Sequence, residues 1–156
     1  PSRAIVLIAA PGREHEAALR LGRIGFDRVE GYLRDGMAAL TAQPELLAYT
    51  RRSSAPELAA LMAAAHPPLL IDVRTPREWS TRHVDGSLNM PLSRLRDHLA
   101  EIPRDRAIAV QCAGGYRSSI AASMMQQQGI TDLMEVAGGL AAWEAAALPV
   151  ASSPVA

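Results

Sequence analysis

The chain has 156 residues, with 16 lysine or arginine and 16 aspartate or glutamate side chains, so its formal charge at pH 7 is zero. This balance argues against the basic surface of a nucleic-acid-binding protein, and no apolar run approaches the roughly 18 residues of a membrane-spanning helix. Cys112 is the only cysteine, which excludes an internal disulfide framework and suits a reducing, cytoplasmic compartment.

The first 45 residues alternate between strand-like and helix-like segments. The apolar run Ala4–Ala10 predicts a buried strand, and the spacing of apolar residues predicts a helix over Glu14–Ile24. A second strand is predicted at Arg28–Leu33 and a further helix begins at Gly36. We therefore expect a partial domain over residues 1–45. The polar residues 46–55 predict a linker.

Residues 56–150 continue this alternation at greater length. Four strands are predicted, at Leu69–Val73, Leu88–Met90, Ile108–Val110 and Leu133–Val136. Helices are predicted at Glu57–Ala65, Pro76–Trp79, Pro91–Leu99, from Ser118 to the residue before Gly129, and at Leu140–Ala147. The alternation favours an α/β fold, a parallel sheet flanked by helices on both faces. Residues 151–156 are predicted to form a loose tail.

The loop after the third of these strands carries the cysteine. Gly114 and Gly115 let this loop curl so that its N–H groups, which lack partners at a helix start, face inward. A thiol in such a nest ionises more easily, and Arg117 adds a permanent cation. A cysteine that only fills a core needs neither feature, so we interpret Cys112 as a thiolate nucleophile. The candidate substrate-binding residues are Ala113, Gly114, Gly115, Tyr116, Arg117 and Ser118.

Other polar residues have a structural interpretation first. Asp72 and Arg74 are candidate supporting residues, and fixing loops by hydrogen bonds is the favoured role for both. His83 is expected to act as a hydrogen-bonding residue of a turn. His15, His66 and His98 are scattered, with no cysteine or acid at ligand spacing, so we predict no metal site and no cofactor.

An internal repeat relates the two parts of the chain. In this alignment Ala9 stands opposite Cys112 and Glu14 opposite Arg117, so the first copy lacks both the nucleophile and the cation. The glycines that correspond are Gly12 with Gly115, Gly25 with Gly129, and Gly36 with Gly139. We interpret residues 1–45 as the inactive second half of a domain whose complete copy is residues 56–150.

Half a domain cannot easily bury its own sheet. We expect residues 1–45 to pack against the complete domain or against a region missing from this chain. Their free sheet edge is open to pairing between two chains, as in a homodimer. The first residue is Pro1, so we expect the chain to begin inside a longer protein.

Four segments of residues 56–150 resemble the rhodanese family of sulfurtransferases. They are Leu70–Arg74 with Glu78-Trp79, His83–Pro91 with Asp85 in place of the family's proline, Cys112–Ser118, and Gly138-Gly139 with Trp143. The half copy ahead of them resembles part of the fusions that join a metallo-β-lactamase-fold persulfide dioxygenase to rhodanese repeats.

The resemblance implies a rhodanese-like fold and a two-step sulfur transfer. Cys112 would take a sulfane sulfur from thiosulfate or a persulfide, become a persulfide held by the loop N–H groups, and pass the sulfur to a thiol or cyanide. The implied partners are a small-molecule sulfur donor, a thiol acceptor and a fused or separate persulfide dioxygenase. Related phosphatases have a loop one residue longer between cysteine and arginine, which favours sulfur transfer here. Two alternatives stay open, a non-catalytic binding or regulatory module and a sulfur-relay domain of a larger persulfide-oxidising protein.

Overall fold

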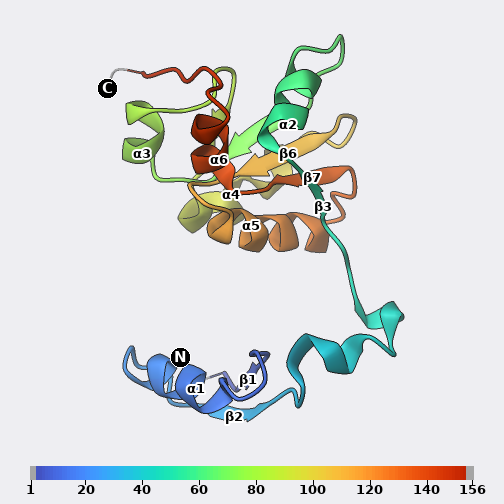
Figure 1. Ribbon diagram of the computed structural model, residues 1–156, viewed down its shortest axis with the longest axis vertical. Helices are drawn as coiled ribbons and strands as arrows, with labels where there is room; N and C mark the ends of the chain where they lie inside the picture. The colour runs from blue at the N-terminus through green and yellow to red at the C-terminus, as the bar shows by residue number, and fades with distance from the viewer. Residues whose placement is uncertain (1–2, 154–156) are drawn as a thin grey trace. The chain divides into compact units, whose positions relative to one another are not determined.

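The computed structural model describes residues 3–153, and the chain divides into two compact units between Tyr49 and Thr50 (Figure 1). The second unit holds a five-stranded sheet of order β3-β7-β6-β4-β5 in which every pairing is parallel. Its strands are β3 (Arg51–Ser53), β4 (Leu69–Asp72), β5 (Leu88–Asn89), β6 (Ile108–Gln111) and β7 (Leu133–Val136). The predicted parallel α/β architecture is therefore confirmed.

Helices cover both faces of this sheet (Figure 1). One face packs against α2 (Ala55–Met62) and α6 (Gly139–Ala145), and the other against α4 (Leu95–His98) and α5 (Tyr116–Gln127). The remaining elements are α3 (Pro76–Thr81) and the 3₁₀ helices η3 (Leu92–Arg94) and η4 (Leu99–Glu101).

The two cores follow from the alternation of side chains along buried strands. In β6, Ile108 and Val110 pack toward α5, whereas Ala109 packs toward α2 and α6. Cys112, the residue after β6, continues the α5-facing row. The carboxyl ends of the central strands β4 and β6 lie in register, with Asp72 beside Gln111, so the loops that follow them share one edge of the sheet.

Two helices that frame this edge begin with capping boxes. Ser54 accepts from the Glu57 N–H at the start of α2, and Thr75 accepts from the Glu78 N–H at the start of α3. The Glu57 and Glu78 carboxylates accept in return from the N–H groups of the capping residues. Each box satisfies helix-start donors within the helix's own first turn.

The linker prediction for residues 46–55 is wrong in its second half. Arg51–Ser53 form β3, which pairs with β7 at the edge of the sheet. Two of its three residues are exposed arginines, a composition typical of edge strands and hard to distinguish from a polar linker.

The tail prediction for residues 151–156 is also wrong where the structure describes it. Ala151 forms an antiparallel bridge with His83, and the Ser153 N–H donates to the Ser80 carbonyl at 3.0 Å. Residues 154–156 lie outside the described part.

The first unit is a strand–helix–strand arrangement. Strands β1 (Ile5–Leu7) and β2 (Val29–Tyr32) pair in parallel, joined by α1 (Glu14–Gly22). The 3₁₀ helices η1 (Gly36–Leu40) and η2 (Pro44–Leu46) follow, so the helix predicted from Gly36 is a 3₁₀ helix. Gly36 is the only buried residue described between residues 3 and 49.

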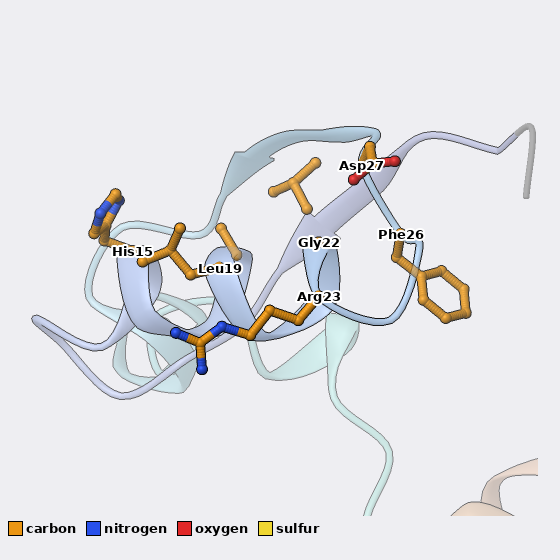
Figure 2. A pocket seen from close by; sticks show the side chains of 8 residues that line it. His15, Leu19, Gly22, Arg23, Phe26 and Asp27 are labelled. Atoms are coloured by element: carbon orange, nitrogen blue, oxygen red, sulfur yellow. The ribbon is translucent and has the colours of Figure 1, made fainter.

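A pocket runs along one side of α1. Figure 2 shows His15 and Leu19 on the helix and Arg23, Phe26 and Asp27 just beyond its end. The pocket is lined by three ionisable side chains, His15, Arg23 and Asp27, among apolar residues and Gly22. No helix within residues 3–153 is both long enough and apolar enough to cross a membrane.

Candidate active site

Cys112 lies between a central strand and the start of a long helix. β6 ends at Gln111, and α5 begins at Tyr116, so the intervening loop turns within four residues. Cys112 itself is 1% exposed, while its neighbours Ala113 and Gly114 are exposed. The thiol therefore lies beneath a loop that is itself at the surface.

The loop presents backbone N–H groups to the sulfur. The Gly115 N–H donates to Cys112 Sγ at 3.1 Å. Gly115 has φ of 102°, a left-handed conformation that side chains rarely adopt, and this turns its N–H inward at the helix start. The Gly115 N–H thus points at the Cys112 sulfur from the start of α5.

Helix α6 holds the opposite side of the loop backbone. The Leu140 N–H donates to the Cys112 carbonyl at 2.8 Å, and the Ala141 N–H donates to the Ala113 carbonyl at 3.0 Å. Both donors belong to the first turn of α6, where N–H groups have no intrahelical partner. The loop carbonyls are thereby drawn toward α6.

Gly139 makes this approach feasible. A Cβ atom at Gly139 would collide with the Cys112 carbonyl, and both Gly138 and Gly139 have positive φ, at 73° and 55°. The glycine pair thus lets α6 start directly against the cysteine loop.

These contacts set the acidity of the thiol. Burial raises the pKa of Cys112, but the hydrogen bond between its sulfur and the Ser118 hydroxyl, together with those from the backbone N–H groups of Ser118, Gly114 and Gly115, outweighs burial. The net result is a thiol pKa below its ordinary value, as expected where loop amides and a hydroxyl surround sulfur.

Arg117 is not free to face a substrate. Its guanidinium donates to both carboxylate oxygens of Glu78, at 2.8 and 2.7 Å, and it is about one-third exposed. Glu78 already caps α3 through Thr75. The bidentate ion pair between Arg117 and Glu78 therefore connects the cysteine loop to α3.

Asp72 and Arg74 form a buried ion pair. The Arg74 Nε and Nη2 groups donate to the Asp72 carboxylate, with a shortest distance of 2.7 Å, and Arg74 also donates to the Arg82 carbonyl. Gln111 Nε2 donates to Asp72 Oδ2 at 3.2 Å, which connects this pair to the residue before the cysteine. The two residues have the structural contacts expected of them.

The other predicted side chains divide between the surface and the core. Tyr116 is 87% exposed, whereas Ser118 is fully buried. His83 stacks on Trp79 with ring centroids 3.9 Å apart, and its Nδ1 lies 2.8 Å from the Trp79 carbonyl oxygen, a structural role. Within residues 3–153, no three His, Cys, Asp or Glu side chains are grouped to hold a metal ion.

Two acids near the site were missed by sequence reasoning. Glu78 enters the sequence analysis only as part of the family resemblance, and its partner Arg117 is 39 residues away in the chain. Glu135 lies in β7 among apolar neighbours and accepts a hydrogen bond from Ser118. An isolated acid within a predicted buried strand was the available signal for Glu135.

Residues 54–146 match the family model of the rhodanese-like domain. The chain belongs to the rhodanese family. It is 34% identical over 82 residues to a sulfurtransferase of Allochromatium vinosum, a match that spans 53% of this chain and 77% of that protein. It is 38% identical over 76 residues to the probable adenylyltransferase/sulfurtransferase MoeZ of Mycobacterium tuberculosis, of which it covers only 19%.

A solved structure gives the same result. The rhodanese-related protein of Thermoplasma volcanium superposes with a TM-score of 0.60 at 33% identity, covering 65% of this chain and 97% of that one. This rhodanese assignment, with relatives named as sulfurtransferases, supports a role in sulfur transfer.

Proposed function

We propose that this rhodanese domain is a sulfurtransferase that carries a sulfane sulfur as a persulfide on Cys112. The observation that supports this most directly is the Gly115 N–H at 3.1 Å from Cys112 Sγ, in a loop whose carbonyls are held by α6. A sulfur atom surrounded by fixed donors is stabilised as an anion without a neighbouring base.

In the first step the Cys112 thiolate attacks the outer sulfur of thiosulfate or of a persulfide. A bond forms between Cys112 Sγ and that sulfur, while the donor's own sulfur–sulfur bond breaks. Sulfite, or the donor thiolate, leaves with the electron pair of the broken bond. The product is a Cys112 persulfide whose terminal sulfur carries the negative charge.

In the second step a thiolate or cyanide attacks the terminal sulfur. The Cys112 thiolate leaves with the bonding electrons and the acceptor departs as a persulfide or thiocyanate. Each step exchanges one sulfur–sulfur bond or forms one sulfur–carbon bond, so no external oxidant or reductant is consumed. Two half-reactions through a covalent intermediate predict ping-pong kinetics.

The loop residues divide these tasks. The N–H groups of Gly114, Gly115 and Ser118 stabilise the Cys112 thiolate that attacks and later leaves. Arg117 contributes a positive charge near the loop. Because it forms a bidentate ion pair with Glu78, its main role is to hold the loop in place. Tyr116, at 87% exposure, is available to contact an incoming donor.

The test is the intact mass of the protein after incubation with thiosulfate. We expect a gain of one sulfur atom, its removal by cyanide with release of thiocyanate, and no gain in Cys112→Ser. Because Cys112 is the only cysteine, any thiol-bound sulfur must be there. Hydrolysis of p-nitrophenyl phosphate, measured on the same sample, is expected to be absent, and its presence would favour the phosphatase alternative.

An absence of sulfur gain with any donor would contradict the enzyme proposal. It would favour the non-catalytic binding or regulatory module instead. Loading by a persulfide but not by thiosulfate would favour the sulfur-relay alternative, in which a fused or separate persulfide dioxygenase is the partner.

We also propose that residues 1–45 are a degenerate copy of the second half of this domain. Backbone conformation supports the alignment, because the paired glycines all have positive φ. The values are 81° and 102° for Gly12 and Gly115, 85° and 78° for Gly25 and Gly129, and 55° for both Gly36 and Gly139. Asp35, opposite Gly138, also has positive φ, at 64°.

The contacts of this first copy agree with an inactive loop. A Cβ atom at Gly36 would collide with the Ala9 carbonyl, as one at Gly139 would with the Cys112 carbonyl. The Gly12 N–H donates to the Glu14 carboxylate at 3.1 Å, whereas its counterpart Gly115 donates to sulfur. The chain's own acid therefore uses the N–H group that would face an anion.

A further inference from the structure

A buried acid lies behind the nucleophile. Glu135 is 5% exposed, and β7 places it beside Val110, on the α5-facing side of the sheet that Cys112 also occupies. Its Oε1 lies 2.8 Å from Ser118 Oγ. Ser118 Oγ in turn lies 3.6 Å from Cys112 Sγ, so one hydroxyl connects the carboxylate to the thiol.

The Ser118 hydroxyl has a single proton and three acceptors within reach. These are Glu135 Oε1 at 2.8 Å, the Gly115 carbonyl at 3.0 Å and Cys112 Sγ at 3.6 Å. A hydrogen bond to a carboxylate is the strongest of the three kinds, and here it is also the shortest. With the proton on the Glu135 side, Ser118 Oγ turns a lone pair toward sulfur and accepts from the neutral thiol.

We propose that Glu135 is a positioning residue that restrains ionisation of Cys112 by holding the Ser118 proton. The inference rests on Cys112 being the nucleophile of the sulfur transfer proposed above. Glu135 acts in two ways in the same direction. It withdraws the hydroxyl donor from the thiolate, and its negative charge disfavours a second anion close by.

The cysteine loop and Glu135 thus have opposite effects on the ionisation of Cys112. The N–H groups of the loop favour the thiolate, whereas the pair of Glu135 and Ser118 favours the thiol. Such an arrangement keeps part of the resting protein in the less reactive thiol form.

The charged groups on the neighbouring elements are Arg52, Arg117 and Asp72. Arg52 on β3 places Nε 3.8 Å from Glu135 Oε2, but its side chain is 62% exposed. Arg117 on α5 is neutralised by Glu78 on α3. Asp72 on β4 is paired with Arg74 and alternates with Ile71 and Val73, so it lies on the opposite face of the sheet with Leu70. Of these groups Arg52 is therefore the cation that partly offsets the Glu135 charge.

The test is the pH dependence of Cys112 alkylation by iodoacetamide, which reacts with the thiolate. In Glu135→Gln, the amide keeps the shape and hydrogen-bonding capacity of the side chain but removes its charge. We expect the midpoint of the alkylation profile to fall by roughly one pH unit, and the rate below that midpoint to rise about tenfold. Glu101→Gln, which changes an exposed acid paired with His98, is the matched control and should leave the profile unchanged.

An unchanged or higher midpoint in Glu135→Gln would overturn the proposal. If Glu135→Gln does not fold, Arg52→Gln replaces it, because removing this exposed cation leaves the Glu135 charge less compensated. We then expect the midpoint to rise, and a fixed or lower midpoint would contradict the role of Glu135. Since alkylation requires no sulfur donor, a protein that shows these shifts but gains no sulfur would refute the proposed function alone.

Discussion

The Arg117 guanidinium and the Glu78 carboxylate form a bidentate ion pair, with nitrogen–oxygen distances of 2.8 and 2.7 Å. The same carboxylate accepts from the Thr75 N–H and hydroxyl at the start of α3. The loop that carries the thiol is thereby bound to a helix from a different part of the sheet edge. This explains how a surface loop with two glycines is kept in one conformation.

Glu78→Gln should loosen this connection while preserving the helix cap, since glutamine also completes a capping box. The pKa of the Glu78 carboxyl is held well below its usual range, first by the Arg117 guanidinium and then by Thr75. A carboxylate with a lowered pKa stabilises the fold above its unfolded-state pKa, near 4.3, and loses that contribution as pH falls. We expect the variant to be less stable by about 1 kcal/mol at pH 7, because the pair is partly exposed.

Urea unfolding at pH 7 and at pH 3 measures this difference. The gap in unfolding free energy between the wild type and Glu78→Gln should narrow at the lower pH. Arg77→Gln, on the same helix but exposed, is a suitable control for α3. A gap that is equal at both values would show that the ion pair does not contribute.

Gly139→Ala should both destabilise the protein and disturb the thiol. The new Cβ would meet the Cys112 carbonyl, and φ of 55° is unfavourable for alanine, which together cost about 2–4 kcal/mol. Relief of the collision moves the loop away from α6, so the loop amides lose their alignment on sulfur. We expect a lower melting temperature and a higher alkylation midpoint.

Gly114→Ala is the matched comparison for that change. Gly114 has no positive φ, and a Cβ there would meet nothing within 4 Å. This variant should fold with nearly wild-type stability. Equal losses in the two variants would mean that the contact between Gly139 and the Cys112 carbonyl is unimportant.

Asp72→Asn should cost more stability than either of these changes. It leaves the Arg74 guanidinium, 4% exposed, without its carboxylate, and breaking a buried ion pair typically costs 3–5 kcal/mol. The expected result is a large fall in the urea midpoint, compared with Asp105→Asn at an exposed position as control. A small effect on the midpoint would indicate that Arg74 finds other acceptors.

The wild-type thiol should titrate below the value of about 8.5 for a free cysteine. Burial raises its pKa, but the contact with the Ser118 hydroxyl and the hydrogen bonds from the backbone N–H groups of Ser118, Gly114 and Gly115 outweigh burial and lower it. The rate of iodoacetamide alkylation should therefore reach its plateau at lower pH than for a cysteine in a short peptide. A midpoint at or above that of the peptide would contradict the proposed nest.

The order of strands and helices could be predicted because buried strands such as β4 and β6 are continuous apolar runs bounded by turn residues. The cysteine loop was also predictable, since its glycines, helix start and arginine are local in the chain. Strand β3 was not, because Arg51 and Arg52 are polar residues that form a strand only by pairing with β7, some 80 residues later.

The partners of the charged residues could not be predicted from the sequence either. Arg117 was expected to bind an anionic substrate, and the structure pairs it with Glu78. The contact of Glu135 with Ser118 depends on which face of β7 is turned toward α5, and this follows from strand register rather than from a motif. Long-range pairs of this kind are set by tertiary packing, which a single sequence does not specify.

The Gly12 N–H donates to Glu14, whereas its counterpart Gly115 donates to the Cys112 sulfur. The loop at Gly12 can therefore be compared with the cysteine loop within one chain. Both loops place a glycine with positive φ ahead of a helix. Only the second has a cysteine three residues before that glycine, and two residues after it stands Arg117 where the first has Glu14. Introducing Ala9→Cys together with Glu14→Ala would place a thiol in this first loop. Its acidity, compared with that of Cys112, would separate the effect of the turn alone from the effects of Ser118, Arg117 and α6. The protein thus contains a natural template on which a thiol-activating loop can be assembled one side chain at a time.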